Sequence, residues 1–166
     1  MTDVATVDFR FLGKQLVALI GSEPDALANT ANFVGLLHDA IPRINWLGVY
    51  VLRGDELVLG PFQGKPACVR LPLGKGVCGT AASRLQTLRV ADVHDFAGHI
   101  ACDPASRSEI VVPLMLDEEL AGVLDIDSPF SDRFTETDQH GIEMLCRTFT
   151  AELSRKTAPP RGTGFI

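Results

Sequence analysis

Residues 46–62 read WLGVYVLRGDELVLGPF, in which two apolar runs flank a central Gly-Asp pair. A glycine-aspartate pair between two such runs is typical of the tight turn of a β-hairpin. The pattern therefore predicts antiparallel strands over 46–52 and 56–62. Because side chains alternate along a strand, the first strand has one face of Leu47, Val49 and Val51 and another of Trp46, Gly48, Tyr50 and Leu52. Both faces are apolar, so we expect both to be covered.

Two helices are predicted before this hairpin. Apolar residues recur at helical spacing over 9–20, and Gly21 ends that segment. The stretch 22–25, Ser-Glu-Pro-Asp, resembles a capping box with proline in the first turn. The second helix is expected to continue to about Ala40, since Pro42 stops it. Both helices need an apolar surface to cover, and we expect it to be the sheet.

Short elements and a long loop are predicted after the hairpin. The sequence favours a third strand over 67–71, a helix of small residues over 77–85 and a brief strand over 88–90. The loop that follows, over 92–107, is long for a connection inside one domain. Loops of this kind are commonly functional.

A second hairpin and a long helix are predicted to complete the fold. The strands are expected over 110–116 and 120–126, and the helix over 135–156, with Thr135 and Asp138 as its cap. The order of elements indicates an α+β fold. We expect a central antiparallel sheet with helices on one side and a loop-covered pocket on the other.

Length and composition favour a single domain. The 166 residues, 46% of them hydrophobic, are enough for one sizeable core. We expect residues 1–157 to form that domain and 158–166 to be a disordered tail. A net charge of −6 disfavours nucleic acid as a partner, because phosphate contacts need clustered Lys and Arg. Nowhere do eighteen apolar residues stand together, so we expect no membrane association and a cytoplasmic location.

Cysteines are concentrated in residues 60–113, a stretch rich in glycine and proline. It contains Cys68, Cys78 and Cys102, and such a stretch is expected to be mostly loop around short elements. In a reducing compartment, three loop cysteines favour redox chemistry: one thiolate attacks, and another closes the resulting sulfenic acid as a disulfide. Cys146 lies on the predicted closing helix, where we expect it only to pack.

Zinc is the alternative for the same stretch. Four residues there are of types that bind zinc: Cys68, Cys78, His99 and Cys102. Only His99 and Cys102 have the close spacing of a ligand pair, so the spacing disfavours a structural zinc site. We therefore expect no bound metal and no bound cofactor.

Three carboxylates are candidates for acid chemistry: Glu109, Asp125 and Asp127. The two aspartates alternate with apolar residues in LAGVLDID, so they point the same way from one predicted strand. Beside an apolar pocket, such carboxylates repel each other and lose solvation, which raises at least one pKa and keeps a proton for acid catalysis. The alternative is that they are solvated strand ends.

Three segments resemble a known family. They are GPFQGKPACVRLPLGKGVCGTAA at 60–82, DVHDFAGHIACDPASRSEIVVP at 92–113 and GVLDIDSP at 122–129. Together they look like the GAF-domain free methionine-(R)-sulfoxide reductases, over most of the chain from about Trp46 onward. The three-cysteine pattern distinguishes that family from regulatory GAF domains. One departure is Ala97, where the family pattern leads us to expect proline before GHIAC.

The resemblance implies reduction of free L-methionine-(R)-sulfoxide, with thioredoxin as external reductant and a homodimer as the assembly. The implied nucleophile is Cys102, and either Cys68 or Cys78 is the implied resolving cysteine. Three carboxylates and two aromatic residues complete the implied site: Glu109, Asp125, Asp127, Trp46 and Tyr50. All five are implied to bind substrate, and Glu109 and Asp127 also to act in catalysis. The alternative is a non-enzymatic GAF sensor of a small ligand or of thiol redox state.

Overall fold

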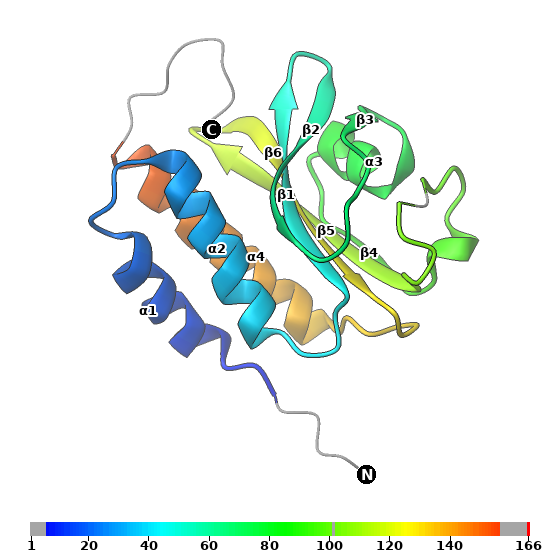
Figure 1. Ribbon diagram of the computed structural model, residues 1–166, viewed down its shortest axis with the longest axis horizontal. Coiled ribbons are helices and arrows are strands. Elements are labelled where there is room, and N and C mark those ends of the chain that lie inside the picture. Colours follow the sequence, from blue (N-terminus) through cyan, green and yellow to red (C-terminus); the bar gives the residue numbers. More distant parts are fainter. Residues whose placement is uncertain (1–5, 101, 157–165) are drawn as a thin grey trace.

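The computed structural model describes residues 6–100, 102–156 and 166. Its centre is a six-stranded antiparallel sheet with the strand order β3-β2-β1-β6-β5-β4 (Figure 1). The strands are β1 (Trp46–Arg53), β2 (Glu56–Gln63), β3 (Arg70–Pro72), β4 (Leu88–Val90), β5 (Ser108–Leu116) and β6 (Glu119–Ser128). The helices are α1 (Phe9–Ile20), α2 (Ala26–Ala40), α3 (Gly76–Arg84), the 3-10 helix η1 (Val93–Asp95) and α4 (Glu136–Ser154).

Both predicted hairpins are confirmed. In the first, Arg53 pairs with Glu56 across a two-residue loop in which Gly54 has a φ of 65°. In the second, both loop residues between β5 and β6 have positive φ, as a type I′ turn requires. The two hairpins join through β1 and β6, which lie side by side at the centre of the sheet. The side chains in the middle of each face of the sheet therefore come from β1 and β6.

The two faces of the sheet are covered differently. Helices α1, α2 and α4 pack on one face, where they bury Leu47, Val49 and Val51 of β1 (Figure 1). Helix α3 packs on the opposite face with Trp46 and Tyr50. The alternation predicted for the first strand is confirmed, and so is the α+β architecture with a central antiparallel sheet. The expectation of helices on one side is right for α1, α2 and α4, whereas α3 belongs to the pocket side.

Two predicted boundaries are wrong. The third strand, expected over 67–71, is the shorter β3 and starts at Arg70. Cys68, two residues before this strand, forms a disulfide bond, and its carbonyl oxygen accepts a hydrogen bond from Tyr50 Oη at 2.9 Å. Helix α2 starts after Asp25, whose side chain accepts from the Ala28 backbone N–H at 2.8 Å. Pro24 therefore precedes the helix and is not in its first turn.

The closing helix has the predicted cap. Thr135 and Asp138 form a reciprocal capping box, in which each side chain accepts from the other residue's backbone N–H. Cys146 is buried on the side of α4 that faces the sheet, as expected for a packing residue. No helix in the described part of the chain is long and apolar enough to cross a membrane.

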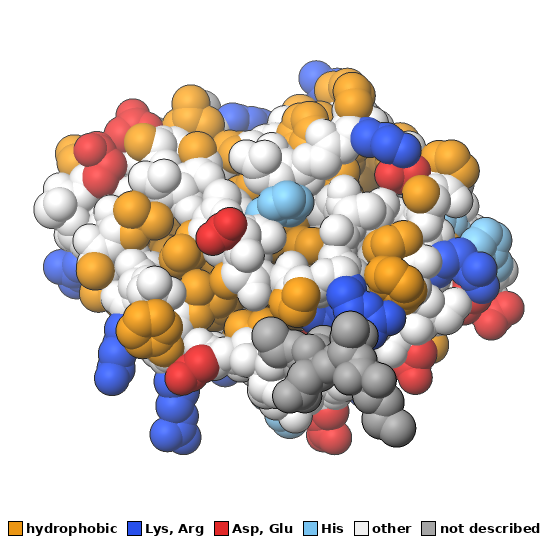
Figure 2. All heavy atoms as spheres, turned by 60° about the horizontal axis from the view of Figure 1, so that its bottom comes forward, with side chains coloured by type: hydrophobic (Ala, Val, Ile, Leu, Met, Phe, Trp, Pro, Cys, Tyr) orange, Lys and Arg blue, Asp and Glu red, His pale blue; other side chains and the backbone are white. Residues whose placement is uncertain are grey.

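Most of the predicted tail, residues 158–165, lies outside the described residues. Ile166 is described, and it packs against the helix-side core while Arg53 donates a hydrogen bond to its carbonyl oxygen. On the face of the molecule shown in Figure 2, acidic and basic side chains are interspersed among apolar and uncharged ones.

Candidate active site

A pocket lies on the α3 side of the sheet. It has an empty volume of about 550 Å³, part of which is open to solvent. Seven of the eight predicted site residues line it: Trp46, Tyr50, Cys78, Cys102, Glu109, Asp125 and Asp127. The eighth, Cys68, is bonded to Cys102. The fold therefore brings together residues that lie as much as 81 positions apart, from 46 to 127.

A disulfide joins Cys68 to Cys102 at the edge of this pocket. The two residues are 34 positions apart in sequence, and their Cα atoms lie 5.6 Å apart. The bond ties the segment before β3 to the loop 92–107. The zinc set considered from the sequence used both of these sulfurs as ligands, and with the disulfide formed neither is a thiolate.

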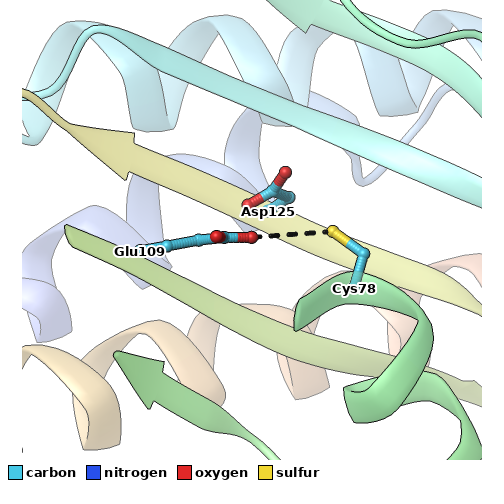
Figure 3. Close-up of side chains that lie close together, drawn as sticks. All are labelled: Cys78, Glu109 and Asp125. Carbon is cyan, nitrogen blue, oxygen red and sulfur yellow. Dashed lines mark hydrogen bonds between the residues drawn. The ribbon is translucent and has the colours of Figure 1, made fainter. Parts of the chain in front are cut away.

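Cys78 differs from Cys68 and Cys102. It lies in α3, as the helix predicted over 77–85 implies, and not in a loop like the other two; its side chain is free and buried. A Cβ on the next residue, Gly79, would lie 2.2 Å from the Pro72 carbonyl oxygen. Glycine at this position lets α3 approach β3 closely. That close approach holds Cys78 over the sheet, where its Sγ lies 3.9 Å from Glu109 Oε1 (Figure 3).

Strand register places the three carboxylates together. Glu109 of β5 pairs with Asp127 of β6, and Asp125 lies two residues before Asp127 on the same face. Glu109 and Asp125 are only 5% and 7% exposed. The alternative that these residues are solvated strand ends is therefore wrong for both of them.

Burial raises the pKa of all three carboxyl groups. The pKa values of Glu109 and Asp127 lie well above the usual range because burial, and then the charge of Asp125, disfavour the ionised form. Burial raises the pKa of Asp125 to about 6. Burial also raises the pKa of the Cys78 thiol well above its usual value, with the charge of Asp125 as the next cause. Burial thus favours the protonated form of Glu109 and Asp127, whereas the pKa of Asp125, about 6, lies below neutral pH.

The aromatic wall is held by hydrogen bonds to the loop before β3. Trp46 Nε1 donates to the Lys65 carbonyl oxygen at 3.0 Å, and Tyr50 Oη donates to that of Cys68. The Trp46 ring stacks near Tyr50, with ring centroids 5.9 Å apart. A Cβ at Gly48 would lie 2.4 Å from the indole, so the missing side chain there lets the ring lie across β1.

Three polar residues near the pocket were missed, or given another role, in the sequence analysis. Asn45 donates to Asp103 and to Ser106, each at 3.1 Å, and Ser106 hydrogen-bonds Asp127. His99, considered as a zinc ligand, has Nε2 3.7 Å from Glu109 Oε2. The Asn45 contacts span about sixty positions, and nothing in the local sequence indicates them.

Comparison with known proteins identifies the family. Residues 9–153 match the GAF domain. The free methionine-R-sulfoxide reductase of Escherichia coli is 54% identical over 134 residues, which cover 81% of each chain.

Solved structures agree with this. The fRMsr of Staphylococcus aureus in complex with substrate is 48% identical, with a TM-score of 0.86, over 92% of this chain and 99% of that one. The free methionine-R-sulfoxide reductase of Neisseria meningitidis in complex with its substrate is 41% identical, with a TM-score of 0.84, over 89% and 90% of the two chains. By sequence and by fold, this chain belongs to the GAF domain family and, within it, to the free methionine-R-sulfoxide reductases.

Proposed function

We propose that this protein reduces free L-methionine-(R)-sulfoxide to methionine, with Cys102 as the nucleophile. The observation that carries the proposal is the Cys68–Cys102 disulfide at the edge of a pocket that also holds three carboxylates with raised pKa values. A dithiol that can be oxidised and a proton donor are the two parts that this chemistry needs.

The first step takes place in the reduced enzyme. The Cys102 thiolate attacks the sulfoxide sulfur, and a carboxylic acid protonates the sulfoxide oxygen, which is otherwise a poor leaving group. The oxygen ends on the Cys102 sulfur. Methionine is released with its sulfur reduced by two electrons, and Cys102 is oxidised to a sulfenic acid by the same two electrons.

Glu109 and Asp127 are the proposed acids, because their pKa values lie well above the usual carboxyl range and both line the pocket. Asp125 takes another role in the proposal. It is mostly ionised at neutral pH, so it can pair with the ammonium group of a free amino acid. Trp46 and Tyr50 then form the apolar wall for the rest of the substrate.

The second step regenerates the nucleophile. The Cys68 thiol gives up its proton and attacks the sulfur of the Cys102 sulfenic acid. The disulfide forms, and the hydroxyl group leaves with that proton as water. The observed pairing supports Cys68 as the resolving residue. Burial raises the pKa of the Cys78 thiol above the usual value of a cysteine, which makes Cys78 a poorer nucleophile than an ordinary cysteine. A dithiol protein such as thioredoxin then reduces the disulfide. Thioredoxin, a homodimer and a cytoplasmic location belong to the proposal through the family resemblance.

The test is turnover of the purified protein. Free L-methionine-(R)-sulfoxide and the (S)-epimer are each incubated with enzyme and thioredoxin, and methionine is measured by amino-acid analysis. We expect methionine from the (R)-epimer only. If neither epimer gave methionine, the reductase proposal would be wrong and the alternative, a non-enzymatic sensor, would remain. No specific observation in the described residues favours that alternative.

A further inference from the structure

Three side chains of metal-binding type converge at one side of the pocket (Figure 3). Cys78 comes from α3, Glu109 from β5 and Asp125 from β6. The Cys78 Sγ and one carboxylate oxygen from each acid all lie within 4.8 Å of one another. Zinc bonds of about 2.0–2.3 Å place neighbouring ligand atoms roughly 3.5 Å apart. Small side-chain rotations are therefore enough to close these three atoms around one ion.

An unsatisfied atom points to a ligand at this place. Asp125 Oδ1 is buried and has no hydrogen-bond partner among the described residues, and the side chain lines the pocket. A buried carboxylate oxygen without a partner costs free energy. Within the described part of the chain, no Lys or Arg forms an ion pair with Glu109, Asp125 or Asp127. The cluster thus has acidic groups in excess of the cations that face them.

The donor set selects the kind of cation. Magnesium and calcium take oxygen ligands, whereas zinc accepts thiolate, imidazole and carboxylate together. His99 supplies the imidazole next to the three residues, since its Nε2 lies 3.7 Å from Glu109 Oε2. We propose that Cys78, Glu109 and Asp125, with His99 as the fourth ligand, form a Zn²⁺ site inside the pocket.

This site differs from the zinc set considered in the sequence analysis. That set needs the sulfurs of Cys68 and Cys102, which are bonded to each other here. The proposed site needs only the free thiol of Cys78, so it is available in the oxidised enzyme. On binding, the Cys78 thiol releases its proton to solvent and coordinates as the thiolate. The ion occupies the carboxylates proposed to bind and protonate the substrate, so zinc excludes the sulfoxide from the pocket.

The test uses Co²⁺ as a spectroscopic substitute for Zn²⁺. The full-length protein is kept free of reductant, so that the Cys68–Cys102 disulfide stays intact and cannot contribute ligands. We expect a single equivalent of Co²⁺ to produce a thiolate-to-cobalt charge-transfer band, which Zn²⁺ then removes. The Cys78→Ser variant should lose the band, and Asp125→Asn should bind Co²⁺ about tenfold more weakly or worse.

Cys146→Ser is the matched control, because Cys146 is also a buried free cysteine but lies on the opposite face of the sheet. It should keep the band unchanged. Circular dichroism checks that Cys78→Ser is folded, and Asp125→Asn decides the question if it is not. A wild-type protein without the band, a band that persists in folded Cys78→Ser, or unchanged affinity in Asp125→Asn would each overturn the site.

A second arm measures inhibition and rests on the proposed function. Because small dithiols bind zinc, the enzyme is first reduced and freed of reductant, and a single turnover of free methionine sulfoxide is then followed. We expect Zn²⁺ to block the turnover and a chelator to restore it. Zinc that binds without slowing turnover would overturn the exclusion of substrate. An enzyme with no turnover at all would instead count against the reductase proposal, while the cobalt band would still decide the metal site.

Discussion

The two sides of β6 have opposite chemistry although they share one backbone. Leu124 and Ile126 are fully buried against the helices, whereas Asp125 and Asp127 alternate with them and line the pocket. Burial of the aliphatic pair stabilises the fold, at about 25 cal/mol for each Å² of apolar surface. Burial of the carboxylates costs free energy but raises their pKa values. The comparison teaches that one face of the sheet stabilises the protein and the other carries the chemistry.

The largest difference in activity is expected between a cysteine variant on the pocket side of the sheet and one on the helix side. Cys102→Ser should abolish reduction, because a serine hydroxyl cannot attack the sulfoxide sulfur and accept its oxygen. Cys146→Ser, on the helix side, should cost stability of about 1–3 kcal/mol and leave kcat nearly intact. The measurement is steady-state turnover with a dithiol, together with chemical denaturation. Substantial activity in Cys102→Ser would remove it as the nucleophile.

The next effect concerns recycling on the pocket side. Cys68→Ser should still complete a single turnover, because the first chemical step needs only Cys102. Its steady-state rate with thioredoxin should fall to a small fraction of the wild-type rate, since the disulfide cannot form. Single-turnover and steady-state assays distinguish the two steps, with thioredoxin rather than a small dithiol as reductant. If Cys68→Ser cycles normally, and Cys78→Ser does not, Cys78 is the resolving residue.

Neighbouring residues of β5 offer a matched pair for the acids. Glu109→Gln keeps the shape of the side chain but removes its acidic proton, so we expect kcat to fall by about 100-fold or more. Ile110→Val, on the helix face, should cost about 0.5–1.5 kcal/mol of stability and leave kcat unchanged. A Glu109→Gln variant in which only KM rises would show that this carboxyl group binds substrate and donates no proton.

A smaller effect is expected in the pH dependence of stability. The pKa of Asp125 rises from 3.8 to about 6 on folding, so the folded state binds this proton more tightly. The contribution of Asp125 to the free energy of unfolding is therefore fully present below about pH 4 and is lost as pH rises through about 6. The total change is about 3 kcal/mol. Asp125→Asn removes the titration, so the variant should gain stability relative to wild type over this window.

The comparison with Asp125→Asn is needed because His99 acts in the opposite direction. Burial lowers the pKa of His99, so its contribution grows as pH rises through the same range. Urea denaturation of both proteins at several pH values cancels the shared His99 contribution. The difference that remains comes from Asp125 itself and from the effect of its charge on the pKa values of Glu109 and Asp127. If the difference in stability between wild type and Asp125→Asn stayed constant with pH, burial would not raise the pKa of Asp125 in the folded protein.

Local sequence patterns predicted much of the fold but only part of the pocket. Alternation in 46–52 and the turn at Gly54 were enough to predict the first hairpin and its two faces. The pairing of Cys68 with Cys102 could not be predicted from local patterns, because the two cysteines lie 34 positions apart. Asn45 was missed for a similar reason, since its contacts to Asp103 and Ser106 exist only after the loop 92–107 has packed. Local sequence reports periodicity and turns, whereas these contacts depend on the whole fold.

The last prediction concerns the substrate rather than the protein. The side of the pocket that holds Asp125 has a buried carboxylate oxygen with no partner among the described residues, and this aspartate is mostly ionised at neutral pH. The ammonium group of free methionine sulfoxide can satisfy that oxygen, whereas an N-acetylated substrate presents a neutral amide. A hydrogen bond to a charged group is worth about 1.5–3 kcal/mol, so kcat/KM should fall about 10- to 100-fold for the N-acetyl derivative. In Asp125→Asn the two substrates should differ much less in kcat/KM, because the charge that pairs with the ammonium group is gone. Equal efficiency for the two substrates in the wild-type enzyme would mean that the pocket does not select the free amino acid, and the role given to Asp125 would have to be abandoned.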